Sequence, residues 1–524
     1  MRIVEINDND IYGKVFNGYD IMEKFNHSNS HKVNQLVIHK YSSNPNVHSY
    51  FLCKEVLELE KHIYEEETNK LSTHSLLSIS SDYLLNHKLF QKADLVHFHQ
   101  FHNSHFNLTS FLEMTKNKPA VISFHDPWFM TGRCVHPNEC QKWKSGCEKC
   151  NKLGTLFAFS KDNCDELWKI KSEVIKNSDP DIIVSSEFML NMIKKHPYTK
   201  DLTVHVLPFG IDTTKYEFKT TKEEAKKILG INPEDIVIFF RSAEEKGVKY
   251  IIDALKQLKT KKKITLLTCA EIGLLGEIEK KYNIIELGYI EESIINQCYN
   301  ASDIFLMPSL GESFGMMAIE AMASSLPVVV FDNTALPTVT SAPDVGILVK
   351  NKDSKDLHDK IKKLIDEEDY RINRGVLGRE LVNKKYKIEK YYSDLNKIYE
   401  QAHNRQIKEK HKKETKRLID YKNKEVQKLL PKLQEIYISC FPNEKSPSLF
   451  DNMEKVRKSH DSKIKYSDIN VQNVILEFNK ILYNKAKKIE KENFSIKQTK
   501  IYQLLKKSRI LRIIVNKLRH IIKK

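Results

Sequence analysis

Short runs of apolar, largely β-branched residues recur along the first 331 residues, and segments of helical length separate them. The runs are 2–6, 33–39, 94–99, 120–124, 181–185, 236–240, 264–268, 303–307 and 327–331. Strands that are apolar along their whole length are typical of parallel sheets with helices on both faces. The sequence therefore predicts an α/β fold with doubly wound sheets.

The chain divides at a segment that joins the first five runs to the last four. Residues 206–212 (Val-Leu-Pro-Phe-Gly-Ile-Asp) carry a proline and a glycine, which suits a hinge between domains. A chain of 524 residues also exceeds what one hydrophobic core usually supports. We therefore expect one Rossmann-like lobe at 1–205 and a second at 206–400. Ligands of such sheets bind beyond the carboxyl ends of the strands, so two facing lobes make a cleft.

The positive charge of the chain is concentrated in residues 401–524. The whole chain carries a formal net charge of +16. This segment has 32 Lys and Arg against 13 Asp and Glu, which leaves 53 basic and 56 acidic residues in the first 400. It contains no glycine, and its pattern predicts an appended helical extension. A surface for an anionic partner therefore belongs to the extension.

The end of this extension predicts an amphipathic helix. Residues 500–524 hold nine basic and no acidic side chains. The apolar residues that fall near one helical face are Ile501, Leu504, Leu505, Leu511, Ile514, Val515, Leu518 and Ile522. Such a helix lies on an anionic membrane surface or packs on the protein itself. The cations beside the apolar face favour the membrane.

The N-terminus and the hydropathy pattern indicate in which cellular compartment the protein is expected. Glu5, Asp8 and Asp10 come too early for the apolar core of a signal peptide, and no run approaches 18 apolar residues. We expect a cytoplasmic protein, peripheral on the inner face of the cell membrane. In that reducing compartment the nine cysteines are expected to be free thiols or metal ligands rather than disulfides.

The strongest functional signal follows the run at 303–307. It is the segment Pro308-Ser-Leu-Gly-Glu-Ser-Phe-Gly-Met-Met-Ala-Ile-Glu320. Gly315 lets backbone amides approach a ligand, and a helix that begins there directs its positive end at a diphosphate. Glu312 precedes the helix and Glu320 lies about two turns along it. One carboxylate can therefore reach the sugar and the other the ribose of the same nucleotide-sugar donor.

Further polar residues end strands in both expected lobes. Arg241 and Lys246 lie between the run at 236–240 and a helix, where two cations would neutralise a departing diphosphate. His125 and Asp126 end the run at 120–124, where they could bond a sugar hydroxyl or orient the acceptor. An ordinary histidine satisfied at a strand end is the alternative for His125.

Together these motifs resemble the retaining GT-B glycosyltransferases with an E-x7-E signature, the family 4-like proteins also called glycosyl transferases group 1. Glu312 and Glu320 match the two signature glutamates. The other positions that match the donor site of the family are Gly13, Arg241, Lys246, Ser313, Phe314, Gly315 and Met316. The family has a comparable His-Asp at 125–126, near the anomeric carbon. Phe240 departs from its pattern, because a glycine usually precedes the arginine.

The resemblance implies a retaining hexosyltransferase. It would move a sugar from a nucleotide-diphosphate sugar to a glycan or lipid-linked acceptor in cell-surface polysaccharide biosynthesis. Catalysis would require no cofactor and no metal, because Arg241, Lys246 and the helix start at Gly315 supply the positive field. A catalytically silent sugar-binding or scaffold protein of the same fold is one alternative. A nucleic-acid-binding protein would explain the basic extension but would leave the Glu312/Glu320 motif without a purpose.

A cysteine-rich loop occupies residues 134–150. Cys134, Cys140, Cys147 and Cys150 are spaced so that four thiolates could bind one structural Zn²⁺ and stiffen the loop. Free thiols and a redox pair remain the alternatives. Some members of the resembled family carry a similar insertion after the His-Asp, and we expect the loop to cover the acceptor side of the cleft.

Overall fold

The structure is a computed structural model that describes residues 1–408, with gaps at 12, 14–16, 51–59, 62, 66, 77, 79, 101, 103–105, 152, 154–158 and 218–219. The predicted helical extension, including its terminal amphipathic helix, lies outside the described residues from position 409 onward. Within the part described, no helix has both the length and the apolar character that crossing a membrane requires.

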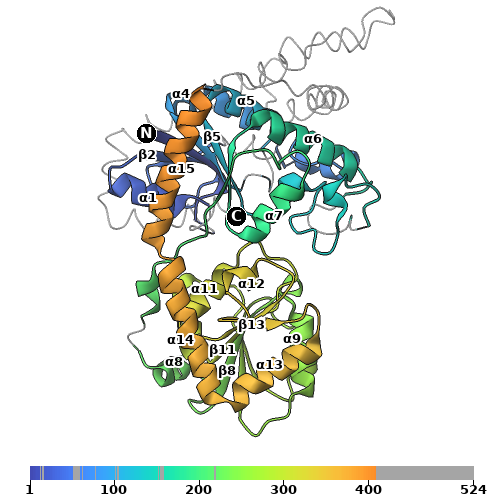
Figure 1. Cartoon of the computed structure of the whole chain (residues 1–524), viewed down its shortest axis with the longest axis vertical. Helices are drawn as coiled ribbons and strands as arrows, with labels where there is room; N and C mark the ends of the chain where they lie inside the picture. Colours follow the sequence, from blue (N-terminus) through green and yellow to red (C-terminus); the bar gives the residue numbers. More distant parts are fainter. Residues whose placement is uncertain are drawn as a thin grey trace, which may run out of the picture.

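Two parallel sheets form two separate lobes (Figure 1). The first has the order β3-β2-β1-β4-β5-β6-β7. Its strands are β1 (Arg2–Asn9), β2 (Lys32–His39), β3 (Val47–Ser49), β4 (Leu95–Phe98), β5 (Ala120–Phe124), β6 (Asp181–Val184) and β7 (Val204–Val206). The second has the order β10-β9-β8-β11-β12-β13. Its strands are β8 (Ile236–Ser242), β9 (Ile264–Ala270), β10 (Asn283–Glu286), β11 (Ile304–Met307), β12 (Val328–Phe331) and β13 (Ile347–Val349).

Helices cover both faces of each sheet. In β1, Val4 and Ile3 point to different hydrophobic clusters, and in β8, Phe240 and Phe239 do the same. The helices of the first lobe are α1 (Tyr19–His27), α3 (Ser80–Tyr83), α4 (Lys88–Lys92), α5 (Leu108–Asn117), α6 (Cys164–Ser178) and α7 (Glu187–Lys195). Those of the second are α8 (Lys222–Ile228), α9 (Val248–Gln257), α10 (Glu292–Ala301), α11 (Met316–Ala323), α12 (Leu336–Val339), α13 (Ser354–Asp366) and α14 (Glu368–Lys385). The predicted doubly wound architecture is thus confirmed.

Local signals in the sequence set several helix starts. The hydroxyl of Ser186 accepts a hydrogen bond from the amide of Met189 at the start of α7. Thr221 and Glu224 form a reciprocal capping box at the start of α8. These caps satisfy amides that have no partner within the helix, so each helix begins at a defined residue after its strand or loop.

The chain crosses between the lobes twice, and the two crossings run side by side. The amide of Ile211 donates to the carbonyl of Tyr386 (2.8 Å), and the amide of Ile388 donates to the carbonyl of Ile211 (3.1 Å). A side chain at Gly210 would meet the backbone of Ile388 at 2.7 Å, so only glycine permits this approach. The hinge expected at 206–212 is therefore half of a paired connection.

After the second crossing, α15 (Ile388–Lys408) returns along the first lobe (Figure 1). Gln406 donates to the carbonyl of Ala120 and accepts from its amide, both at 2.8 Å. Arg405 forms an ion pair with Asp181 at 2.9 Å. The lobe limits therefore differ from the expected 205 and 400: β7 ends the first sheet at Val206, and α15 packs on the first lobe rather than the second.

Candidate active site

A cavity of about 370 Å³ lies between the carboxyl ends of the two sheets. The polar side chains that line it come from strand ends and from the loops that follow them. They are Gln100, His125, Asp126, His136, Ser185, Arg241, Lys246, Glu312 and Ser313. Phe314, Gly315 and Met316 also line it, so the cavity contains nine of the eleven predicted catalytic and donor-binding residues. The other two, Gly13 and Glu320, lie outside this lining.

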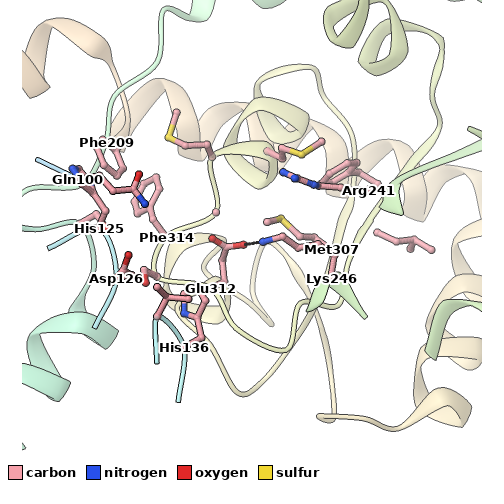
Figure 2. Close-up of a pocket in the computed structure, with 18 residues that line it drawn as sticks. Gln100, His125, Asp126, His136, Phe209, Arg241, Lys246, Met307, Glu312 and Phe314 are labelled. Atoms are coloured by element: carbon pink, nitrogen blue, oxygen red, sulfur yellow. Dashed lines mark hydrogen bonds and ion pairs between the residues drawn. The ribbon is translucent and has the colours of Figure 1, made fainter. Parts of the chain in front are cut away.

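The second lobe contributes the charges of the cavity. Arg241 lies near the end of β8, and Lys246 ends the short helix Glu244–Lys246 that follows. The Nζ of Lys246 lies 2.8 Å from Oε2 of Glu312, and both side chains are mostly buried. Figure 2 shows this pair near the centre of the cavity, with Arg241 beside it and His125 and Asp126 on the opposite side. Two cations and one carboxylate therefore face the histidine side of the cleft.

A glycine sets the position of Lys246. Gly247 has φ 78, and a side chain there would meet the carbonyl oxygen of Pro308 at 2.1 Å. The amide of Leu310 donates to the carbonyl of Glu245 (3.0 Å), which fastens the same two loops together. Because these backbone contacts join the loop after β8 to the loop after β11, Lys246 can reach Glu312 although 66 residues separate them.

The start of α11 is prepared for an anion. Gly315 precedes the helix with φ 103, and a side chain there would meet Cδ2 of Leu336 at 2.4 Å. Nε of Arg241 and Oγ of Ser313 are buried, and neither has a hydrogen-bond partner in the described part of the chain. An unsatisfied buried polar group costs about 1–3 kcal/mol. A ligand with oxygen acceptors would remove that cost and would meet the positive end of the helix.

The first lobe contributes His125 and Asp126 from the end of β5. Burial, together with the nearby His99, lowers the pKa of His125 to about 3, so the ring is neutral at physiological pH. Burial alone would raise the pKa of Asp126. His102 at 3.1 Å and the amide of Trp128 at 2.8 Å outweigh that effect, and the pKa is lowered. Asp126 is therefore an ionised, firmly held acceptor.

Glu320 lies on α11, beyond the residues that line the cavity. The hydroxyl of Tyr299 donates to its Oε2 at 2.8 Å. Burial raises the pKa of Glu320 to about 7, and Tyr299 only partly opposes this. Its ionisation therefore changes within the physiological range, unlike that of an exposed glutamate.

Gly13 also lies apart from the cavity lining. It has φ 73, and its carbonyl accepts a hydrogen bond from the amide of Asn17 at 2.9 Å. Its neighbours at 12 and 14–16 are outside the described residues. The structure thus identifies the residue as part of a turn after β1, and the predicted contact of Gly13 with the donor stays a prediction.

Nine of the 18 lining residues were not predicted as site residues, among them Gln100, His136, Ser185 and Phe209. Gln100 and Ser185 follow β4 and β6, so the rule that ligands meet the carboxyl ends of parallel strands could have identified both. Phe209 comes from the first crossing and packs edge-on against Phe314 at 5.3 Å between ring centroids. His136 comes from the cysteine-rich loop, and no local pattern predicts its place in the cavity.

The cysteine-rich loop reaches across to the second lobe. A side chain at Gly311 would meet Cβ of His136 at 2.8 Å, so the loop lies directly on the segment that precedes Glu312. Glu139 also forms an ion pair with Lys352 of the second lobe at 2.6 Å. The loop thus covers one side of the cleft.

Comparisons with known proteins agree with this geometry. Residues 221–380 match the family model described as Glycosyl transferases group 1. The chain is 26% identical over 288 residues to the capsular polysaccharide biosynthesis glycosyltransferase CapM of Staphylococcus aureus. These residues cover 49% of this chain and 75% of CapM. It is 26% identical over 223 residues to the lipopolysaccharide core biosynthesis mannosyltransferase LpsB of Rhizobium meliloti. These residues cover 38% of this chain and 61% of LpsB.

Other relatives are matched over a smaller share of their length. The D-inositol 3-phosphate glycosyltransferase of Corynebacterium aurimucosum is 28% identical over 224 residues, which cover 39% of this chain and 53% of that enzyme. Compared with several curated relatives, the chain therefore spans only about half to three fifths of their length.

Solved structures support the architecture of both lobes. Sucrose-phosphate synthase from Thermosynechococcus elongatus superposes with a TM-score of 0.55 at 14% identity, over 76% of this chain and 99% of that one. HepE of Anabaena, solved in complex with UDP and glucose, gives a TM-score of 0.53 at 13% identity, over 76% and 99%. Such identities show the fold alone. The chain thus has the GT-B fold, and residues 221–380 of its second lobe match the glycosyl transferases group 1 family.

Proposed function

We propose that this protein transfers a sugar, with retention of the anomeric configuration, from a nucleotide-diphosphate sugar to a glycan or lipid-linked acceptor. One observation carries the proposal. Arg241, Lys246 and the start of α11 meet at one side of an interlobe cavity, with Glu312 beside them. That arrangement suits a leaving diphosphate joined to a sugar.

The cations would act on the charge that develops as the sugar leaves. The bond between the anomeric carbon and the diphosphate oxygen breaks, and the diphosphate gains negative charge. Arg241 and Lys246 would stabilise that charge together with the amides at the start of α11, without a metal ion. Glu312 would leave its pairing with Lys246 and accept hydrogen bonds from sugar hydroxyls.

The acid–base state of the first-lobe residues supports attack from the face that the diphosphate leaves. His125 is neutral with a pKa of about 3, so it has little basicity, and Asp126 is already engaged by His102 and the amide of Trp128. Neither residue is poised as a strong general base near pH 7. In the proposed step, the acceptor oxygen bonds to the anomeric carbon, and its proton passes to the departing phosphate oxygen. His125 and Asp126 would orient the sugar and the acceptor.

Relatives support the proposed pathway class. CapM is named for capsular polysaccharide biosynthesis and LpsB for lipopolysaccharide core biosynthesis. We propose a cell-surface polysaccharide or glycolipid as the acceptor here, handled on the cytoplasmic side of the membrane. A scaffold protein that keeps the fold without activity would bind the donor but would not turn it over.

A thermal-shift screen followed by product analysis tests this proposal. Uridine, guanosine and adenosine diphosphates are compared, because a ligand present at 100 times its Kd stabilises the folded state by about 2.7 kcal/mol. We expect one of them to raise the Tm of the protein. The matching sugar nucleotide should then be consumed in the presence of an acceptor, and NMR should show a glycoside that retains the anomeric configuration of the donor. Binding without consumption would support the silent scaffold, and an inverted product would contradict the mechanism.

Glu320 predicts a pH dependence of donor binding. Its carboxyl is mainly protonated below pH 7, the value to which burial raises its pKa, and mainly ionised above it. The ionised form accepts stronger hydrogen bonds from ribose hydroxyls, so the Kd of the sugar nucleotide should fall several-fold from pH 6 to pH 8. The pyrophosphate of an intact sugar nucleotide does not titrate in that range, so calorimetry reports the protein.

The matched control for this pH dependence is Glu320→Gln, which keeps the shape but does not ionise. Its Kd should change little between pH 6 and pH 8. An equally steep profile in this variant would assign the dependence to another group and would remove Glu320 from the ribose site.

A further inference from the structure

Five cysteines surround one small cavity beside the cleft. Cys134, Cys140, Cys147 and Cys150 from the cysteine-rich loop line it together with Cys164, the first residue of α6. None of the five forms a disulfide, and in the described part of the chain no three of their sulfurs lie within 4.8 Å of one another. The fold has thus gathered around one cavity thiols that are as many as 30 residues apart in the sequence.

Two buried basic side chains, Lys171 and Arg133, lie in this part of the first lobe. Lys171 on α6 is fully buried, and its Nζ donates to the carbonyl of Trp128 at 2.7 Å. In the described part of the chain Lys171 forms no ion pair with a carboxylate, but its Nζ lies 3.9 Å from the centroid of the Trp128 ring. The groups whose charge would act on it most strongly are Cys147, then Cys134 and Cys164. Arg133, 1% exposed, lies in the same cavity wall and over the ring of Phe159.

Transfer of a charge from water into the protein interior costs several kcal/mol, and burial lowers the pKa of Lys171 to about 7, so Trp128 compensates only part of the cost of the ammonium form. Neutral thiols offer no compensation to Lys171. A metal ion bound by four thiolates would carry a net charge of −2, since four negative sulfurs exceed the two positive charges of Zn²⁺. Lys171 and Arg133 carry charge of the sign that such a cluster attracts.

The backbone around the thiols is also prepared for an anionic cluster. The amide of Gly132 donates to Sγ of Cys147 at 3.1 Å, so a backbone hydrogen bond holds this sulfur in place at the cavity. A side chain at Gly132 would meet the carbonyl oxygen of Cys164 at 2.5 Å, so glycine allows the loop to lie on the start of α6. Asp162 accepts hydrogen bonds from the amides of Cys150 and Cys164, which fixes the other end of the loop.

From these observations we propose that Cys134, Cys140, Cys147 and Cys150 bind one structural Zn²⁺, with Lys171 and Arg133 balancing its charge. Each cysteine binds as a thiolate and releases its proton to solvent, so binding involves no redox change. Cys164 packs beside the site as a thiol. The consequence for the cleft is direct, because the same loop carries His136, which lies against Gly311 and next to Glu312. The metal would therefore hold one wall of the substrate cavity in place.

Metal analysis of the full-length protein tests the site without reference to transfer activity. Protein produced in zinc-supplemented medium should contain one zinc per chain by mass spectrometry. Cobalt-grown protein should show the intense thiolate-to-Co²⁺ charge-transfer absorption of a tetrahedral site. Cys147→Ser and Cys150→Ser should each lose most of the metal, and Cys164→Ala, altered in the same cavity, should keep it. Zinc-free wild-type protein with no cobalt spectrum would overturn the proposal, and so would loss of zinc from Cys164→Ala with retention in Cys147→Ser.

Lys171→Met tests the charge balance separately. Removing a partner that neighbours metal ligands typically lowers metal affinity by about 10- to 100-fold. We expect this variant to lose zinc at a chelator concentration lower than the wild type requires, by the same factor. An unchanged chelator titration would overturn the role given to Lys171.

Discussion

Replacing Lys246 by methionine should lower kcat/KM by about 10² to 10³, because loss of one group that stabilises transition-state charge has effects of that size. Methionine keeps an apolar chain of similar length, so packing against the loop after β11 changes little.

Glu312→Ala should also lower turnover by about 10², since the sugar hydroxyls lose their acceptor. The measurement is steady-state release of the nucleoside diphosphate from the donor identified by thermal shift.

A matched control variant makes this prediction specific. Lys249 lies three residues further along the same segment and is exposed on α9, so Lys249→Met removes an equal charge outside the cavity. It should leave kcat/KM within about twofold, as for a surface charge. If Lys246→Met retained wild-type turnover, the diphosphate would have to be stabilised elsewhere, and the proposed mechanism would be wrong.

Gly247→Ala should destabilise the second lobe by about 2–4 kcal/mol and lower activity in the fraction that folds. Two costs combine at this position. A φ of 78 costs an L-residue about 1–2 kcal/mol, and the new Cβ would meet the carbonyl oxygen of Pro308 at 2.1 Å. Because that backbone atom cannot move aside as a side chain can, the loop carrying Lys246 must shift away from Glu312.

Gly230→Ala separates the two costs. Gly230 has φ 70 in the same lobe, but nothing lies within 4 Å of the Cβ position. This variant should lose only about 1–2 kcal/mol in urea unfolding and should keep its kcat/KM. Equal losses of stability in the two variants, with no fall in activity for Gly247→Ala, would show that contact with Pro308 does not position Lys246.

The central strands were predictable because each is a continuous apolar run that both layers of helices bury. All nine predicted runs are strands of the two sheets. The four strands that the sequence did not reveal are β3, β7, β10 and β13, and they are the edges of the two sheets. An edge strand pairs on one side only and needs less apolar sequence. β10, for example, is exposed or half-buried along its whole length. Its pairing is decided by the neighbouring strand rather than by its own composition.

The local motifs of the site were also within reach of the sequence. A strand followed by a glycine and a helix start is a property of consecutive residues, and Gly315 occupies that position. The partners of the motif residues were not predictable in this way. Glu320, expected at the ribose of the donor, bonds to Tyr299 in this structure, 21 residues away, and burial raises its pKa although this hydrogen bond partly opposes the rise.

Sequence alone determined the α/β class, the two-lobed division and the segments that carry the site, because each depends on hydrophobic periodicity or on a short motif. Tertiary structure decided that Lys246 pairs with Glu312, that α15 returns to the first lobe and that Lys171 is buried against Trp128. Those outcomes depend on how loops and lobes pack across tens to hundreds of residues. Burial and charge compensation at such contacts are set by the whole fold, and no local stretch of sequence encodes them.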